Sequence, residues 1–331
     1  MNSSPIFISL LYRSGSTVLI LALGQSPQIK ISYDTVHFMR FSYGKYHPIA
    51  ERFPELLADT FQRVKERRGI ELKLDQIESA IRRHEVITEG VVYDEIMRSF
   101  LDLKPGERWL DRTAVKWESI PHFLNMFPQG KVIHTYRDPR AVLASYKKMT
   151  YHPGLMYMDS IFASLAMFNF IGQESIRNHP QIYLLKYENL VANPEHTLKS
   201  VCDFLEIDFI PQMLDVSSFQ DQLGNPFDGN SSHTGNRATI DSTTAHLWQN
   251  TLSPIEIYLT EMVLKDKLKT YGYDFTGIDL NSEEWYQLYD MLHTDFLHKR
   301  YRYWLTHGDG VQAYPDTPGA YEEPPTQEDV S

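Results

Sequence analysis

The amino-acid sequence predicts an α/β fold in which a central parallel sheet lies between two layers of helices. Its 331 residues and hydrophobic share of 42% are sufficient for a large buried core. Three strand-like apolar runs, at 6–11, 131–136 and 182–186, are each followed by a helical pattern. Such alternation is typical of crossover units, which build parallel sheets with helices on both faces. A three-layer α/β/α arrangement is therefore expected.

The first unit contains a turn that is suited to an anion. The strand at 6–11 ends in Tyr12-Arg13-Ser14-Gly15-Ser16-Thr17, and apolar residues at helical spacing follow at 17–24. Hydroxyls, a guanidinium and the N–H groups of a helix N-terminus all favour an anion, and glycine permits close approach. The lysine and first glycine of the triphosphate-binding pattern G-x-x-x-x-G-K-[ST] are missing. A helix N-cap with a solvated arginine is the structural alternative.

Residues 33–85 follow the first unit and are expected to form a substrate-binding insertion, because α/β folds place such elements beyond the carboxyl ends of their strands. Helical patterns occupy 49–68 and 74–84 within this insertion, and 93–101 and 115–127 after it.

A second candidate anion site follows the strand at 131–136. The strand ends in Arg137, Asp138-Pro139 suits the start of a helix, and Ser145 lies about two turns into the helical pattern. Arg137 therefore stands at the carboxyl end of a strand, where α/β proteins bind ligands. Taken singly, Arg137 could form a salt bridge and Ser145 could face solvent.

The remainder of the chain continues the α/β pattern and then changes in character. Further strand and helix patterns occupy 160–176, 182–186, 195–205, 254–269 and 284–305. A polar loop is expected at 217–246, and a loop of this length is usually functional or disordered. We divide the chain into a domain at 1–276, an aromatic helical extension at 277–307 and an acidic tail at 308–331, which is expected to be disordered.

Charge and cysteine content exclude several classes of function. The formal net charge is −11, and residues 277–331 hold three basic and eleven acidic residues, a net charge of −8. The rest of the chain has no strongly basic face for a nucleic acid. Cys202 is the only cysteine, which excludes an intrachain disulfide and a cysteine-rich zinc site. With no recognisable signal peptide or membrane span, a soluble cytoplasmic protein is expected.

Together these stretches resemble the sulfotransferases that use 3′-phosphoadenosine 5′-phosphosulfate (PAPS). The family turn [KR]-S-G-[ST]-T is similar to Arg13–Thr17, and the family's Arg-Asp-Pro-Arg stretch, with a serine eight positions after its first arginine, matches Arg137 and Ser145. Tyr187-Glu188-Asn189-Leu190, followed by Asn193-Pro194, resembles the family pattern Y-E-[DN]-L-x-x-[DN]-P. The resemblance implies the P-loop-NTPase-like sulfotransferase fold.

The resemblance covers residues 5 to about 275 and implies a role for each matching residue. Arg13, Ser14, Gly15, Ser16 and Thr17 would hold the 5′-phosphosulfate, Arg137 and Ser145 the 3′-phosphate, and Tyr187 would lie near the adenine. Arg13 would also stabilise charge on the leaving phosphate. Asp111-Arg112-Thr113 resembles the family's E-K-[TN]-P, so Arg112 would replace a lysine near the transferring group, unless it forms a structural ion pair. Arg237, in the late polar loop, would reach the 3′-phosphate.

The general base is expected between residues 32 and 41. His37 can accept a proton near neutral pH. Related branches have patterns such as E-x-H-F-F in which the acid is usually the base, but Thr35 stands in that acid's place and Asp34 is the nearest acid. Both His37 and Asp34 are candidates, and Glu89 is a further acid to consider. A histidine packed among aromatic residues is the structural alternative.

The resemblance implies transfer of a sulfuryl group from PAPS to a hydroxyl-bearing acceptor without a metal, leaving 3′-phosphoadenosine 5′-phosphate (PAP). A small molecule is the expected acceptor. Aromatic residues near His37 suggest an apolar or phenolic body; they are Phe38, Phe41, Tyr43 and Tyr46. Two rival functions remain: a P-loop kinase or triphosphatase, and a non-catalytic protein that binds PAP.

Overall fold

The computed structural model describes residues 4–33, 35–114, 116–148, 154–220, 240 and 242–308. Its centre is a five-stranded sheet in the order β2-β3-β1-β4-β5, in which every neighbouring pair is parallel. The strands are β1 (Ile6–Leu10), β2 (Ile29–Ser32), β3 (Arg108–Ala114), β4 (Lys131–Tyr136) and β5 (Ile182–Lys186). The predicted α/β class and parallel central sheet are confirmed.

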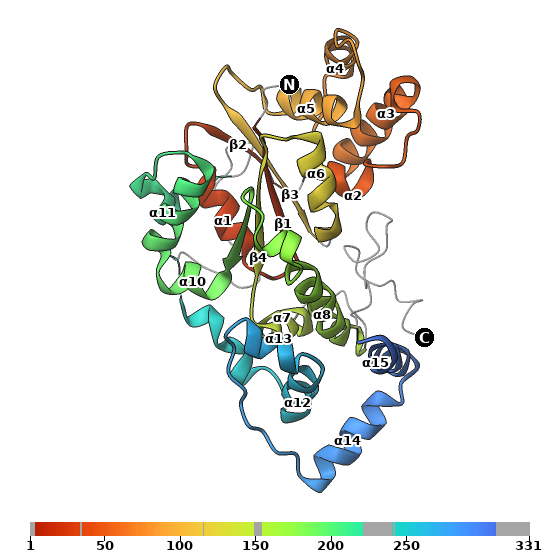
Figure 1. Ribbon diagram of the computed structural model, residues 1–331, viewed down its shortest axis with the longest axis vertical. Helices are drawn as coiled ribbons and strands as arrows, with labels where there is room; N and C mark the ends of the chain where they lie inside the picture. Colours follow the sequence, from red (N-terminus) through yellow and green to blue (C-terminus); the bar gives the residue numbers. More distant parts are fainter. Residues whose placement is uncertain are drawn as a thin grey trace.

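Helices cover both faces of this sheet because alternate side chains of each strand point in opposite directions. In β1, Ile6, Ile8 and Leu10 pack in one hydrophobic cluster, whereas Phe7 packs in the other. Figure 1 shows α1, α10 and α11 on one side of the sheet and α2, α3 and α6 on the other. The two clusters are the two interfaces between the layers, so the α/β/α arrangement is confirmed.

The helices on the first side are α1 (Ser16–Leu23), α10 (Tyr187–Ala192) and α11 (Pro194–Leu205). Helix α1 is buried almost all round, because seven of its residues pack between the sheet and its neighbours. The other side carries α2 (Phe38–Phe41), α3 (Ile49–Arg68), α4 (Leu74–Ile81), α5 (Glu89–Phe100) and α6 (Ile120–Met126). Helices α7 (Pro139–Lys147), α8 (Asp159–Ile171) and α9 (Glu174–Arg177) complete the main body.

The last four helices of the described residues are α12 (Pro254–Val263), α13 (Lys265–Thr270), α14 (Ser282–Leu292) and α15 (Asp295–His307). Figure 1 shows α14 and α15 at one end of the molecule. Leu288 of α14 and Leu297 of α15 are buried in the larger core cluster. Arg300 of α15 also lies 2.5 Å from the carboxylate of Asp159 at the start of α8. Residues 277–307 therefore include side chains that contribute to the main core.

The strand register places the two predicted anion-binding loops at the same edge of the sheet. Leu10, the last residue of β1, pairs with Ala114 of β3 and with Thr135 of β4. The carboxyl ends of these three strands therefore lie at the same level. Arg13 follows β1 and Arg137 follows β4, which brings their loops to the same edge.

The sequence analysis missed or merged several elements. It missed β2, α2, β3 and α10, and its single helices at 160–176, 254–269 and 284–305 are each two helices in the structure. Strand β3 was overlooked because Asp111, Arg112 and Thr113 interrupt its apolar pattern, although all three are buried. Most of the predicted polar loop and all of the tail beyond residue 308 lie outside the described residues.

Candidate functional site

The turn between β1 and α1 has the backbone geometry of an anion-binding loop. Arg13 and Gly15 both have positive φ angles, 69° and 82°, and the Ser14 N–H donates to the carbonyl of Leu11 at 3.3 Å. Helix α1 then begins at Ser16. The free N–H groups at the start of this buried helix give the turn a partial positive charge.

Gly15 is required in this turn because the Tyr187 ring packs directly against it. A Cβ atom on residue 15 would lie 1.9 Å from Cδ2 of Tyr187, a distance at which the two atoms collide. The positive φ angle independently favours glycine. Two motifs that lie far apart in the sequence are therefore in contact through a glycine and an aromatic ring.

The first and second predicted anion sites are also in direct contact. Arg13 Nε donates to Ser145 Oγ at 2.8 Å, and Arg137 Nη1 donates to the backbone carbonyl of Arg13 at 3.2 Å. The guanidinium carbon of Arg137 lies 4.4 Å from the centroid of the Tyr187 ring. The structure thus brings together Arg13, Gly15, Arg137, Ser145 and Tyr187.

Asp138, Arg140 and Glu188 hold the loop around Arg137 in place. The sequence analysis expected Asp138 at the start of the helix and gave no role to Arg140 and Glu188. Asp138 caps α7 by accepting from the Arg140 N–H at 2.9 Å, and its own N–H donates to Glu188 Oε1, also at 2.9 Å. Arg140 forms buried ion pairs with Asp138 at 2.8 Å and with Glu261 at 2.6 Å. Burial raises the pKa of Glu188. The Arg-Asp-Pro-Arg and Tyr-Glu motifs contain these residues, so the signal was present in the sequence.

Arg112 reaches the anion loop from the neighbouring strand β3. Its Nη1 donates to Ser16 Oγ at 3.3 Å and to Thr17 Oγ1 at 3.4 Å, and only 7% of the residue is exposed. The guanidinium carbon also lies 5.1 Å from the centroid of the Tyr33 ring. Its positive charge therefore lies against the hydroxyls at the start of α1.

Of the three candidate bases, the structure describes His37 and Glu89. His37 is buried, has a positive φ angle of 47° immediately before α2, and meets the Phe41 ring edge-on with the centroids 5.9 Å apart. Glu89 accepts a hydrogen bond from the Gly44 N–H at 2.7 Å. Asp34 and Arg237 lie outside the described residues.

Two of the aromatic residues expected in a pocket have other surroundings. Phe38 is fully buried and stacks on Tyr93 with the ring centroids 4.2 Å apart, so it belongs to the core. Phe41 is surrounded by arginines, among them Arg40, whose Nη1 donates to the Tyr12 hydroxyl. Sequence reasoning missed Arg40, a basic residue within the buried stretch FMRF.

The donor groups at the turn fit a ligand that carries phosphate. The Ser14 hydroxyl is buried and has no hydrogen-bond partner among the described residues. A buried hydroxyl of this kind is costly unless a ligand or water satisfies it. Arg13, Arg112 and Arg137 add guanidinium groups, which pair well with phosphate oxygens.

The described ranges contain no group of three or more His, Cys, Asp or Glu side chains arranged to hold a metal ion. Within the same ranges, no helix has the length and apolar character needed to cross a membrane.

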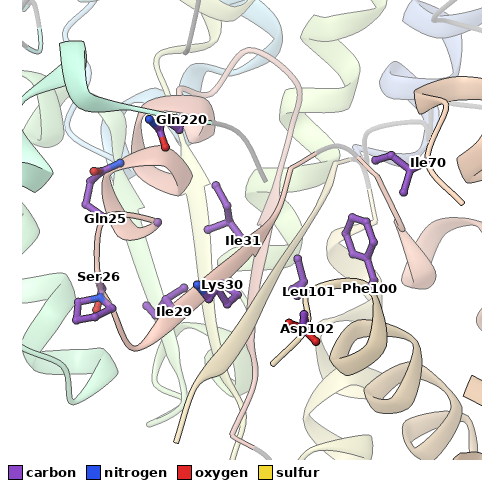
Figure 2. A pocket seen from close by; sticks show the side chains of 12 residues that line it. Gln25, Ser26, Ile29, Lys30, Ile31, Ile70, Phe100, Leu101, Asp102 and Gln220 are labelled. Atoms are coloured by element: carbon purple, nitrogen blue, oxygen red, sulfur yellow. The ribbon is translucent and has the colours of Figure 1, made fainter. Parts of the chain in front are cut away.

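A separate cavity lies near the amino ends of the strands, opposite the end at which the predicted anion-binding loops lie. Its volume is about 550 Å³, and Figure 2 shows side chains from the turn before β2 and from the end of α5 around it. Both segments precede strands, so they lie at the amino end of the sheet. None of the described candidate site residues lines this cavity.

Comparisons with known proteins agree with this geometry. The model of the sulfotransferase family matches residues 5–211. A search of curated proteins found no match. The sulfotransferase domain from the Synechococcus PCC 7002 olefin synthase is 24% identical, with a TM-score of 0.54 over 82% of this chain and 96% of that domain. The sulfotransferase domain from the curacin biosynthetic pathway is 21% identical, with a TM-score of 0.53 over 82% and 99% of the two chains.

The two structural similarities concern the fold. The family match is independent of them and covers the first anion loop, the Arg137 loop and the Tyr187 motif. Because it spans more than half of the sequence, this chain belongs to the sulfotransferase family.

Proposed function

We propose that this protein transfers a sulfuryl group from PAPS to a hydroxyl-bearing small molecule, without a metal ion and in the cytoplasm. The hydrogen bond of 2.8 Å between Arg13 and Ser145 supports this function most directly. It joins the turn expected to hold the 5′-phosphosulfate to the helix expected to hold the 3′-phosphate. A ligand with phosphates at both positions matches two adjoining anion sites, whereas a 5′-triphosphate does not need the second.

PAPS supplies the sulfuryl group and a phosphate that leaves with negative charge. The charge would be stabilised by Arg13, by the hydroxyls of Ser14, Ser16 and Thr17, and by the N-terminus of α1. Arg112 adds a cation beside Ser16 and Thr17. Arg137 and Ser145 would hold the 3′-phosphate and so position the donor.

The acceptor hydroxyl must lose a proton during the transfer. His37 at the start of α2 is one candidate for this proton acceptor, and Asp34 is the other. The insertion at 33–85 that contains both would bind the acceptor. Residues 277–307 would extend the domain of residues 1–276, and Arg237 would complete the donor site.

A kinase or triphosphatase fits the sequence less well. The turn lacks the lysine that reaches the terminal phosphates, and Arg137 follows β4 where a magnesium-binding acid would be expected. A non-catalytic PAP-binding protein would use the same donor site, so only turnover separates it from an enzyme.

A transfer assay with sulfate-labelled PAPS tests the proposal. The purified protein would be incubated with a panel of phenols and aliphatic alcohols in the presence of EDTA, and labelled products would be identified by mass. We expect labelled product in the presence of EDTA. In a separate assay with ATP and magnesium, we expect no hydrolysis of ATP. PAP binding without any labelled product would support the non-catalytic alternative, and magnesium-dependent ATP hydrolysis would support the kinase.

A further inference from the structure

A short segment after α13 forms hydrogen bonds with the side chains that hold the loop around Arg137. Its sequence is Tyr273-Asp274-Phe275-Thr276, and we call residues 273–276 the brace. The family match ends at residue 211, so the brace lies outside the part of the chain that the family model covers. The contacts of the brace with the donor site are therefore a property of the structure that the family motifs do not describe.

Tyr273 is connected through Glu188 to the backbone next to Arg137. The Tyr273 hydroxyl donates to Glu188 Oε2 at 3.1 Å, and the Asp138 N–H donates to Glu188 Oε1 at 2.9 Å. Each oxygen of this carboxylate thus accepts a hydrogen bond, one from the brace and one from the residue directly after Arg137. Tyr273 is buried, so packing holds its hydroxyl in this position.

Arg140 of α7 provides a second connection. Its Nη1 donates to the backbone carbonyl of Asp274 at 2.8 Å, while its Nε and Nη2 donate to the Asp138 carboxylate at 3.0 and 2.8 Å. A guanidinium is planar and its donors point in fixed directions. One rigid group therefore joins the backbone of the brace to the side chain that caps α7.

Glu261 of α12 connects the end of the brace to the same arginine. It accepts from the N–H of Thr276 at 3.0 Å and from the Thr276 hydroxyl at 3.1 Å, and Arg140 Nη1 donates to it at 2.6 Å. Glu261 and Arg140 are both buried. Removing one partner of a buried ion pair is strongly destabilising, so the uncharged Thr276 is the better position at which to test this connection.

These hydrogen bonds all lead to Asp138, the residue that follows Arg137. Glu188 holds the backbone N–H of Asp138, and Arg140 holds its carboxylate. An arginine side chain loses conformational entropy when a ligand fixes it in one geometry. A loop whose backbone is already fixed lowers the cost of ordering on binding, which strengthens the binding of the ligand.

We propose that the brace positions Arg137 for the 3′-phosphate of the donor. This inference rests on the proposed function and makes Tyr273 and Thr276 positioning residues that act through Asp138. A positioning role differs from a purely structural role in its effect on ligands. It affects the binding of a nucleotide that carries a 3′-phosphate and spares one that lacks it.

Two conservative variants of the full chain test the proposal. Tyr273→Phe removes the hydroxyl that donates to Glu188, and Thr276→Val removes the hydroxyl that donates to Glu261. Each variant and the wild type are titrated calorimetrically with PAP and with adenosine 5′-phosphate, which differs from PAP in lacking the 3′-phosphate. We expect each variant to bind PAP about two- to tenfold more weakly, as for the loss of one hydrogen bond. Affinity for adenosine 5′-phosphate should stay unchanged.

The same substitutions at two nearby residues are the matched controls. The Tyr271 hydroxyl lies 3.5 Å from the Phe168 carbonyl in α8, and the Thr270 hydroxyl donates to the Asp266 carbonyl within α13 at 2.8 Å. Tyr271→Phe and Thr270→Val therefore remove hydroxyls whose hydrogen bonds do not lead to Asp138. Both controls should keep the wild-type preference for PAP.

A double variant shows whether the brace acts through Arg137. In a protein that already carries Arg137→Ala, Tyr273→Phe should cause no further loss of PAP affinity, because the side chain that it positions is absent. A purely structural effect of Tyr273→Phe would persist in this background. The same additional loss in both backgrounds would overturn the proposal.

Failure of the brace and failure of the proposed function give different results. If the wild type prefers PAP and both brace variants keep that preference, or lose affinity for both nucleotides equally, the brace has no positioning role and the proposed function stands. If the wild type does not prefer PAP to adenosine 5′-phosphate, the proposed donor site is wrong, and the positioning role of the brace is overturned with it.

Discussion

Arg13 and Ser145 are joined by a hydrogen bond of 2.8 Å although they lie 132 positions apart in the chain. Arg13 stands in the turn after β1, and Ser145 lies near the end of α7, which follows β4. Because β1 and β4 are adjacent parallel strands, their carboxyl ends bring these two elements together. The two predicted phosphate-binding segments are therefore in direct contact.

Ser145→Ala should weaken PAP binding by roughly two- to tenfold, since Arg13 Nε loses its hydrogen-bond acceptor and Ser145 no longer helps to hold the 3′-phosphate. Ser164→Ala is the matched control. It removes a buried hydroxyl that donates to the Ser160 carbonyl at 2.7 Å within α8. Calorimetry with PAP should show a loss for the first variant alone, and equal affinities in both would argue against a role for the Arg13–Ser145 contact.

Gly15→Ala should abolish PAP binding and lower the melting temperature, because the new Cβ would collide with the Tyr187 ring. Overpacking of this kind costs about 1 to 3 kcal/mol, in addition to about 1 to 2 kcal/mol for a left-handed backbone. Gly44→Ala separates the two effects, since Gly44 has a φ angle of 74° but nothing within 4 Å of a Cβ. It should show only the backbone cost and should keep PAP affinity. Similar losses in both variants would contradict the packing of Tyr187 on Gly15.

His37→Ala should lower turnover by about 10² to 10⁴ while PAP affinity persists, if the imidazole accepts the acceptor's proton. Asp34→Asn is the companion variant. Steady-state rates with any acceptor found in the transfer assay distinguish the two. A large loss in Asp34→Asn together with near-normal His37→Ala would assign the base to the acid.

His134 should make stability sensitive to acid. It is fully buried in β4 and lies 3.2 Å from Ser9 Oγ through Nδ1, and burial lowers its pKa to about 3. In the unfolded chain, His134 therefore becomes protonated as the pH falls through about 6.5. In the native state it stays neutral until about pH 3. The contribution of neutral His134 to the free energy of unfolding is fully present above pH 6.5 and is lost as the pH falls toward 3.

Urea unfolding of wild type and His134→Asn at several pH values measures this effect. Between pH 6 and pH 4, the free energy of unfolding of the wild type should fall more steeply, by up to about 1.4 kcal/mol per pH unit. The exposed His196→Asn should follow the wild type. Parallel curves for wild type and His134→Asn would show that His134 does not cause acid sensitivity.

The elements that could be predicted from sequence are those whose pattern is local. Helix α3 and strands β4 and β5 have their predicted bounds because an amphipathic or apolar pattern continues along each of them. Strand β3 was missed because Asp111, Arg112 and Thr113 interrupt its apolar pattern, and the partners of Asp111 and Arg112 lie far away in the sequence. Asp111 accepts from the Tyr93 hydroxyl at 2.5 Å, and Arg112 donates to Ser16 in the first loop.

The same distinction applies to the candidate site. Motif spacing placed Arg13 in one loop, Arg137 in a second loop and Ser145 in the helix after it. Their contact with one another depends on the order of strands in the sheet. The collision that makes Gly15 necessary depends on α10, an element that the sequence analysis did not include. The arginines around Phe41 meet only when α2 and α3 pack together, and this contact cannot be predicted from the local sequence of either helix.

The most direct test of the donor site compares two nucleotides in wild type and Arg137→Ala. If Arg137 holds the 3′-phosphate, PAP should bind about tenfold or more weakly to the variant, from a loss of roughly 1.5 to 3 kcal/mol. Adenosine 5′-phosphosulfate, which lacks the 3′-phosphate, should bind almost equally to both proteins. Calorimetric titration with the two ligands gives this difference. A selective loss for PAP is the predicted result, and equal losses for both ligands would contradict the assignment of Arg137 and of the PAPS site.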